Sequence, residues 1–319
     1  MNGEEELRTT ATLVREIEAS VSEIFIGSPH LVRLAVLGLV GSLHVLIEDI
    51  PGVGKTTLAL SLAEAAGLGF SRIQFTPDLL PADVLGMNVW DPESRSFVFR
   101  PGPIEAQAVL ADELNRTSPR TQSAFLEAMQ EEQITIDGIS RKLPEPFFLI
   151  ATQNPGAFTG TFPLPEAELD RFGLSFQLGY PDAKDETEIL KIKTHPNRRL
   201  RARTVASPAD IAAARNSVLS VHVSEPLREY IVSVARATRD HPDIRLGASP
   251  RAAITLQQAA RAAAAADGRD FAIPEDVENL APAVLAHRIQ LSPQARLARL
   301  DAPECVRRIA ASIPKPTGL

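Results

Sequence analysis

The feature that most constrains the fold of this chain is a short glycine-containing run that follows an apolar segment. Residues 43–47 form an apolar run interrupted only by His44, and a helical pattern extends from residue 55 to near Gly67. In this setting backbone N–H groups and a helix N-terminus can bind phosphate. Lys55 is expected to neutralise β- and γ-phosphate charge, and the Thr56 hydroxyl to ligate Mg²⁺. The predicted phosphate loop consists of Pro51, Gly52, Val53, Gly54, Lys55, Thr56 and Thr57.

One position departs from the usual phosphate-loop pattern. A glycine normally stands at the first position of the loop, and here that position is Asp49. Aspartate tolerates a left-handed backbone better than most residues do, so we expect the loop to form. The structural alternative is a strand-to-helix turn whose Gly-Lys-Thr sequence binds nothing.

The wider chain is organised in two parts. Apolar runs alternate with amphipathic stretches over residues 1–180, which predicts an α/β domain. Most strand candidates are continuous apolar runs, as expected for parallel strands buried on both faces. After Pro181, helix-start signals recur and no convincing strand follows. We therefore predict a P-loop α/β core with a parallel sheet and helices on both faces, followed by a smaller all-α lid domain over residues 181–319. The strand candidates are Leu43–Ile47, Arg72–Phe75, Ala108–Ala111 and Phe147–Ala151.

Two hairpins are predicted as insertions beside the sheet. The Asp137–Gly138 pair stands between short strand-like runs, which is a strong signal for a tight hairpin turn. Residues 85–99 form a second, looser candidate, with the turn-forming run 90–94 in its middle.

Two adjacent carboxylates end an apolar run. Asp112 and Glu113 follow residues 108–111, and in an open α/β sheet the carboxyl ends of the strands form the ligand-binding edge. Asp112 is expected to hold Mg²⁺, directly or through water, and Glu113 to activate an attacking water as general base. An acidic strand end without a function is the alternative, which the upstream phosphate loop makes less favoured.

Three further polar residues are candidates for the same chemistry. Asn154 follows another apolar run and is expected to orient the water or contact the γ-phosphate, with a plain Asn-Pro turn as the alternative. Arg171 is expected to supply positive charge to a neighbouring subunit's γ-phosphate, with a salt bridge to Glu168 or Asp170 as the alternative. Arg251 follows the Ser-Pro helix start at residue 249. A cation in a first turn opposes the helix dipole, which suggests an anionic partner, although many such arginines are simply solvated.

Together these motifs resemble the MoxR family of AAA+ ATPases, over essentially the whole chain. The motifs are longer and more specific than a phosphate loop alone. They are Gly102–Ile104, Ala111–Arg116, Thr121–Glu131, Ala151–Pro155 and Gly160–Phe172.

The resemblance implies a role for each candidate residue. By similarity, Lys55 and Thr56 are the Walker A pair, Asp112 and Glu113 Walker B, Asn154 sensor 1, Arg171 the arginine finger and Arg251 sensor 2, and Ile26 and Gly27 flank adenine. The hairpins resemble the helix-2 and pre-sensor-1 insertions.

The resemblance also implies ligands and partners. ATP and Mg²⁺ are the implied ligands. The implied assembly is a homo-oligomeric ring, commonly a hexamer, with a chaperone-like role on a partner protein that often carries a von Willebrand A domain. The sequence contains no such domain, so such a partner would be a separate chain. The run 156–160 is similar to a loop of bacterial sigma-factor activators, but it stands after the sensor 1 position rather than before Walker B, so we attribute the similarity to coincidence.

Composition restricts the remaining possibilities. The chain has 319 residues, a net charge of −7 and 44% hydrophobic residues, so we expect a globular protein without a general nucleic-acid-binding surface. The N-terminus lacks an apolar signal, and the longest apolar run, Leu31–Ile47, reads as helix, turn and strand rather than a membrane span. The single cysteine, Cys305, excludes an intramolecular disulfide and fits a reducing, cytoplasmic location.

Two other functions remain open at this point. One is the ATPase subunit of a magnesium or cobalt chelatase, which has the same core and insertions. The other is a nucleotide-gated binding module without significant turnover, which the Asp49 departure permits and the intact acid pair disfavours.

Overall fold

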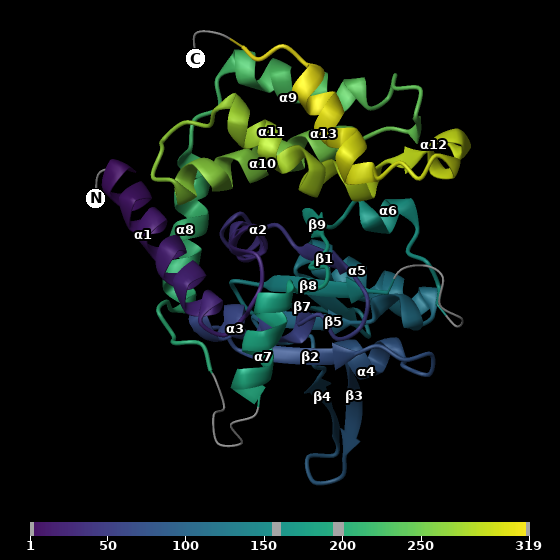
Figure 1. Cartoon of the computed structure of the whole chain (residues 1–319). Helices are drawn as coiled ribbons and strands as arrows, with labels where there is room; N and C mark the ends of the chain where they lie inside the picture. Colours follow the sequence, from purple (N-terminus) through teal and green to yellow (C-terminus); the bar gives the residue numbers. More distant parts are fainter. Residues whose placement is uncertain (1–2, 155–160, 194–200, 317–319) are drawn as a thin grey trace.

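A five-stranded parallel sheet forms the centre of the molecule, with strand order β2–β5–β8–β1–β9 (Figure 1). The structure is a computed structural model that describes residues 3–154, 161–193 and 201–316. The four predicted strands are confirmed, with ends shifted by at most two residues, and a fifth strand, β9, was not predicted. The strands are β1 (Val45–Glu48), β2 (Phe70–Gln74), β5 (Ala108–Asp112), β8 (Phe148–Gln153) and β9 (Leu174–Phe176).

Alternate side chains of the central strands enter two cores on opposite faces of the sheet. In β5, Ala108 and Leu110 enter one core, and Val109 and Ala111 enter the other. Burial on both faces explains why these strands are continuous apolar runs in the sequence. The first core also contains α1 (Gly3–Ser22), α2 (Pro29–Val40) and α3 (Lys55–Ala65), and the second contains α4 (Pro81–Leu85) and α5 (Pro119–Glu131).

The long apolar run Leu31–Ile47 divides as expected. Helix α2 ends at Val40, a turn follows, and β1 begins at Val45. Within the described ranges, no helix is long and apolar enough to cross a membrane.

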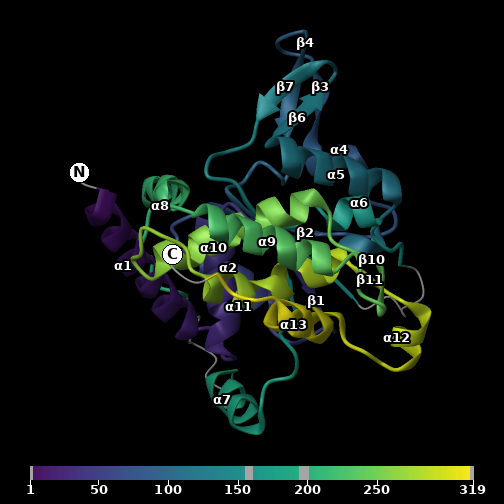
Figure 2. The same ribbon diagram turned by 90° about the horizontal axis from the view of Figure 1, so that it is seen from above.

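Both predicted hairpins are present. Strands β3 (Gly86–Asp91) and β4 (Ser96–Pro101) form one, and β6 (Gln133–Ile136) and β7 (Ile139–Lys142) form the other. Asp137 and Gly138 have φ values of 51° and 78°, as a tight two-residue hairpin turn requires. In Figure 2 the hairpins project together from one side of the core, and Asn88 Nδ2 joins them by donating to Asp137 Oδ2 at 2.7 Å.

The part of the chain after residue 180 is mainly helical. Its central helix is alanine-rich α10, which packs against helices on several sides, including α1 from the N-terminus (Figure 2). Helix α1 and this helical part belong to one continuous hydrophobic core. The change from α/β to helical sequence near residue 180 is therefore not a boundary between two separate cores. The helices are α7 (Ala183–Lys193), α8 (Pro208–Ser220), α9 (Glu225–Ala237), α10 (Pro250–Ala266), α11 (Pro274–Leu285), α12 (Pro293–Leu297) and α13 (Ala302–Ser312).

The prediction that no strand follows Pro181 is wrong. A small antiparallel pair, β10 (Ile244–Leu246) and β11 (Gln290–Leu291), lies within the helical part, so this part is not all-α. Strands of two or three residues leave no periodic pattern to detect, and their pairing is set by tertiary contacts.

His44, just before β1, provides a pH-dependent contribution to stability. Its Nδ1 accepts the Leu149 N–H at 3.1 Å, and burial, assisted by the charge of Arg215, lowers its pKa to about 4. Because this pKa lies below the usual value, stability is fully present above pH ~6.5 and is lost as the pH falls toward 4. We expect urea denaturation to give a free energy of unfolding about 2–3 kcal/mol smaller at pH 4.5 than at pH 7 from this residue.

A His44→Asn variant provides the control for this prediction. Its amide oxygen can still accept the Leu149 N–H, but the side chain does not titrate. We expect the variant to lose less stability than the unmodified protein between pH 7 and 4.5. Equal losses in the two proteins would show that His44 is not responsible.

Candidate active site

The predicted phosphate loop connects β1 to α3. Gly52 and Gly54 have φ values of 91° and 97°, in the left-handed region that favours glycine. Gly54 is the N-cap of α3, and Lys55 is its first residue. Thr56 and Thr57 follow in the first turn, so both threonines lie at the positive end of the helix dipole.

Asp49 has a different role from the one expected. Its φ is not positive, so its tolerance of left-handed backbone is not needed here. Its carboxylate is buried and accepts three backbone N–H groups: Ile50 at 2.8 Å through Oδ1, and Leu178 and Gly179 at 2.7 Å each through Oδ2. Asp49 therefore ties the start of the loop to the segment that follows β9.

Replacing Asp49 with glycine, the residue usual at this position, is expected to destabilise the protein. The change removes the acceptor of three N–H groups, and we expect the free energy of unfolding to fall by about 1–3 kcal/mol in urea denaturation. Asp49→Asn keeps an acceptor oxygen in place and should cost less. If the glycine variant proved as stable as the unmodified protein, the three hydrogen bonds to the Asp49 carboxylate would contribute nothing to the free energy of unfolding.

The Lys55 ammonium is buried within the loop. Its Nζ donates to the backbone carbonyls of Asp49 at 2.6 Å and Ile50 at 3.2 Å. Burial lowers the pKa of Lys55, and the carboxylates of Asp49, Asp112 and Glu113 oppose that shift. The loop and the acid pair are therefore close enough to interact electrostatically.

Ile26 and Gly27 lie beside the loop, and Phe25 explains why. The buried Phe25 ring is so close that a Cβ atom added at Gly27 would lie 2.8 Å from Phe25 Cε1, and one added at Gly54 would lie 3.3 Å from Cε2. The ring thus fills the space between the two glycines. Sequence reasoning missed Phe25.

Both oxygens of Asp112 are engaged at the carboxyl end of β5. Oδ1 accepts the Thr152 hydroxyl at 2.6 Å, and Oδ2 accepts Arg72 Nη2 at 2.7 Å. Arg72 lies on the neighbouring strand β2. Thr152 Oγ1 in turn accepts the Glu113 N–H at 2.9 Å.

Glu113 is held by three side chains. Its Oε2 accepts Gln74 Nε2 and Arg116 Nη1, each at 2.8 Å, and its Oε1 accepts Asn154 Nδ2 at 3.1 Å. Glu113 itself has a left-handed backbone, with φ 57°, a conformation that is sparsely populated outside glycine and often found at functional sites.

Asn154 is brought next to Glu113, as the catalytic interpretation requires. It is 8% exposed, and Asn115 fixes its backbone by donating Nδ2 to the Asn154 carbonyl at 3.0 Å. The Asn154 Oδ1 atom is buried and has no hydrogen-bond partner among the described residues. A buried acceptor without a partner is unusual, and a bound water or ion commonly accounts for one. Residues 155–160, including the run set aside as coincidence, lie outside the described residues.

Arg171 lies at the opposite end of the sheet from the phosphate loop. Strands β1 and β9 are parallel neighbours that pair Val45 with Leu174. The loop follows the carboxyl end of β1, whereas Arg171 precedes the amino end of β9. At about 3.3 Å per residue, the four residue steps of β1 from the level of Leu174 to Asp49 alone span roughly 13 Å, and Arg171 lies beyond that, before β9 begins.

The alternative interpretation of Arg171, a salt bridge with a neighbouring carboxylate, does not hold for the described contacts. Asp170 pairs with Arg288 at 2.9 Å, and Glu168 accepts the Ser123 hydroxyl at 2.6 Å. Arg171 is half-buried at the end of α6 (Glu166–Leu169).

Arg251 lies at the same end of the sheet as Arg171. Ser249 caps α10 by accepting the Ala252 N–H, and its hydroxyl donates to Asp170 Oδ2 at 3.0 Å. Asp170 therefore places a negative charge at the start of α10, where the first-turn cation suggested an anionic partner. The structure brings the acid pair, Asn154 and Lys55 together at one end of the sheet, and the two arginines together at the other.

The environment of Cys305 is that of an inert, packed residue. It is buried, and burial raises the pKa of its thiol, so it resembles a packed apolar residue rather than a reactive one.

Comparisons with known proteins agree with this fold. Residues 44–174 match the profile of the "ATPase family associated with various cellular activities (AAA)", and residues 236–309 match the AAA lid domain. A solved structure from Cytophaga hutchinsonii, named as a candidate ATPase, has a TM-score of 0.90 and 34% identity, covering 98% of each chain.

Two curated relatives define the family more closely. YeaC of Bacillus subtilis is 44% identical, covering 93% of this chain and 92% of the relative. Chaperone MoxR1 of Mycobacterium tuberculosis is 37% identical, covering 96% of this chain and 82% of the relative.

The parallel sheet and the two profile matches place this chain in the AAA+ class. Within that class the chain belongs to the MoxR family of chaperone-like AAA+ ATPases. The resemblance drawn from the motifs is confirmed.

Proposed function

We propose that the chain hydrolyses ATP to ADP and phosphate at the site between the phosphate loop and the ends of β5 and β8. The observation that carries this proposal is the Glu113 carboxylate, which Asn154 holds at 3.1 Å beside Asp112. In this proposal Glu113 takes a proton from the water that attacks the γ-phosphorus, and Asn154 orients that water through its free Oδ1.

Lys55 and the loop N–H groups bind the phosphates. The ammonium exchanges its present carbonyl partners, Asp49 and Ile50, for β- and γ-phosphate oxygens. The segment at Ile26 and Gly27 flanks the adenine, because Phe25 packs it against the loop.

The donor set fits Mg²⁺. The Asp112 carboxylate and the Thr56 hydroxyl offer the hard oxygen ligands that this ion prefers, and Mg²⁺ typically keeps several waters as well. When bound, the ion neutralises charge on the phosphates. Arg72 balances the charge of Asp112 from the other side at 2.7 Å.

The two arginines act on a neighbouring subunit in this proposal. Arg171 cannot reach its own phosphate loop across the sheet, so we propose a homo-oligomeric ring, a hexamer, in which Arg171 and Arg251 complete the site of the next copy. A cyclic arrangement presents one end of each subunit to the opposite end of its neighbour, and a ring closes such head-to-tail contacts.

ATP hydrolysis is proposed to drive the remodelling of a separate protein, as the name of the relative Chaperone MoxR1 suggests. The paired hairpins are a candidate contact surface, because Trp90 and Phe97 stack edge to face there at 5.4 Å while remaining exposed. A partner with a von Willebrand A domain remains our proposal from the family resemblance.

The activity is tested by phosphate release from ATP with the purified protein and Mg²⁺. We expect turnover that EDTA abolishes, and none from a Lys55→Ala variant that no longer binds nucleotide. Release no higher than that of the Lys55→Ala variant would reduce the function to nucleotide-gated binding, the alternative from another class.

A chelatase role is the less supported alternative. A magnesium-chelatase subunit homologue from Methanocaldococcus jannaschii is 30% identical but covers only 57% of this chain. Capture by a Glu113→Gln variant, which should hold ATP, separates the two proposals. Co-purification of a large chelatase subunit would favour the alternative, and co-purification of a von Willebrand A protein would favour the MoxR-type role.

A further inference from the structure

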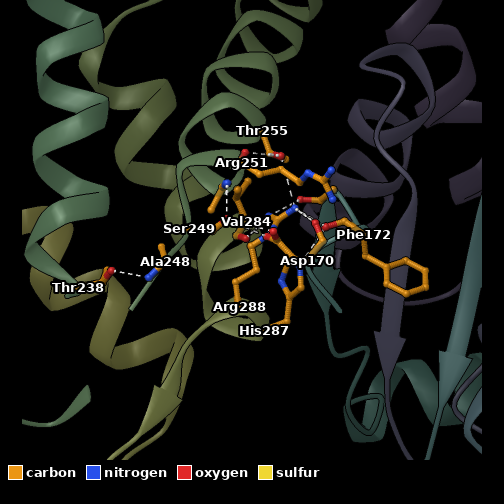
Figure 3. Close-up of polar contacts among 12 residues, drawn as sticks. Asp170, Phe172, Thr238, Ala248, Ser249, Arg251, Thr255, Val284, His287 and Arg288 are labelled. Atoms are coloured by element: carbon orange, nitrogen blue, oxygen red, sulfur yellow. Dashed lines mark hydrogen bonds and ion pairs between the residues drawn. The ribbon is translucent and has the colours of Figure 1, made fainter. Parts of the chain in front are cut away.

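A buried arginine joins the end of α6 to the helical part of the molecule (Figure 3). The Arg288 side chain is only 2% exposed, and its Nε pairs with Asp170 Oδ1 at 2.9 Å. Arg288 Nη2 donates to the carbonyls of Asp170 at 3.1 Å and Phe172 at 2.6 Å, and Nη1 donates to Gly173 at 3.3 Å. One side chain thus fixes both the carboxylate and the backbone around Asp170.

The Asp170 carboxylate also binds the start of α10. The Ser249 hydroxyl donates to it, at 3.2 Å from Oδ1 and 3.0 Å from Oδ2. The same Ser249 oxygen caps α10 through the Ala252 N–H. Asp170 is therefore shared between Arg288 and the first turn of α10, as Figure 3 shows.

The residue before Ser249 is anchored to the end of α9. The Ala248 N–H donates to Thr238 Oγ1 at 2.9 Å, and Arg239 Nε donates to the Ala248 carbonyl at 2.8 Å. The chain comes so close to Arg239 here that a Cβ atom on Gly247 would lie 2.6 Å from its Cα. The start of α10 is thus held by Asp170 through Ser249 and by the end of α9 through Ala248.

The positions of Arg171 and Arg251 follow directly from this cluster. Arg171 is the next residue after Asp170, and Arg251 is two residues after Ser249. Burial lowers the pKa of Arg288 to about 10, and Asp170 opposes that shift, so the guanidinium stays charged at neutral pH. Buried ion pairs seldom add net stability over apolar packing, so this pair suggests a need for fixed geometry.

We propose that Asp170, Ser249 and Arg288 form a joint that fixes the positions of Arg171 and Arg251 relative to each other. The joint thereby places both guanidinium groups where they can contact the ATP bound to a neighbouring copy. Within this joint Arg288 is a positioning residue, not a catalytic one. The proposal rests on the proposed trans role of Arg171.

The test uses Arg288→Lys, which keeps the charge but cannot make the set of bonds that a planar guanidinium makes. We expect turnover per subunit to fall between about 10- and 100-fold, while nucleotide affinity stays within about twofold, because the phosphate loop lies at the other end of the sheet. Turnover within twofold of the unmodified protein, in folded rings, would overturn the proposal.

Assemblies mixed from two variants distinguish a loss of arginine positioning from general damage to the Arg288→Lys subunit. Arg288→Lys subunits retain Glu113, and Glu113→Gln subunits retain an intact joint, so mixing them should restore activity. Mixing Arg288→Lys with Arg171→Ala subunits should restore none, because neither offers a working arginine. Recovery in that second mixture, or none in the first, would contradict the joint.

Two further measurements distinguish a misfolded variant from a failed proposal. If Arg288→Lys does not fold, Ser249→Ala removes the hydroxyl that joins Asp170 to the start of α10, and we expect it to give the same complementation pattern. Failure of Arg171→Ala and Glu113→Gln subunits to complement each other would remove the proposed trans function itself, whereas failure of the Arg288 mixture alone would remove only the joint.

Discussion

Replacing Glu113 with glutamine should lower ATP turnover by a factor between about a hundred and ten thousand, the range that a general base contributes, while ATP still binds. The glutamine keeps the size of the side chain but cannot take a proton from water. Its binding partners lie outside the phosphate loop, so Lys55 and the loop N–H groups remain available to the nucleotide. Phosphate release and fluorescent-nucleotide titration measure the two quantities separately.

An exposed carboxylate at the end of α5 provides the matched control for this prediction. Glu131→Gln makes the same chemical change on the surface, and we expect turnover within about twofold of the unmodified protein, as for most surface substitutions. Undiminished turnover in the Glu113 variant would remove Glu113 as the base. Loss of ATP binding in that variant would mean that the carboxylate supports the loop instead.

Replacing Arg171 with alanine should lower turnover by about a thousandfold or more, which is the usual effect of an arginine finger. The guanidinium neutralises charge that develops on the γ-phosphate in the transition state, so its loss affects the chemical step most. Binding of nucleotide by the same subunit should change little, because Arg171 and the loop lie at opposite ends of the sheet.

An exposed arginine on α9 controls for the loss of a positive charge. Arg236→Ala should leave turnover within about twofold. A tenfold loss of nucleotide affinity in isolated Arg171→Ala subunits, measured by titration, would contradict the placement of this residue away from its own site.

The sequence was informative about the sheet because burial imposes a simple pattern. Strands β1, β5 and β8 are covered on both faces and read as continuous apolar runs. Strand β9 has three residues, and β10 and β11 are as short or shorter, so neither length nor periodicity marks them. Their places depend on neighbours that are far away in the chain.

The site residues that directly follow a strand could be predicted from the sequence. Asp112, Glu113 and Asn154 each follow an apolar run, and parallel strands bring such ends together. Arg72 and Gln74 were missed, although they stand two apart on one face of β2, because the run is short and mostly polar. Pairing of Asp170 with Arg288, 118 residues apart, leaves no signal in a single sequence.

In the proposed ring, two copies of this chain form each ATPase site, and mixing the Arg171→Ala and Glu113→Gln variants tests this arrangement most directly. In randomly mixed rings about a quarter of the interfaces combine an intact Glu113 with a neighbour's intact Arg171. We expect turnover to recover to about that fraction of the unmodified level, from two proteins that are nearly inactive alone. No recovery in rings shown to be mixed would mean that each site is built from one chain.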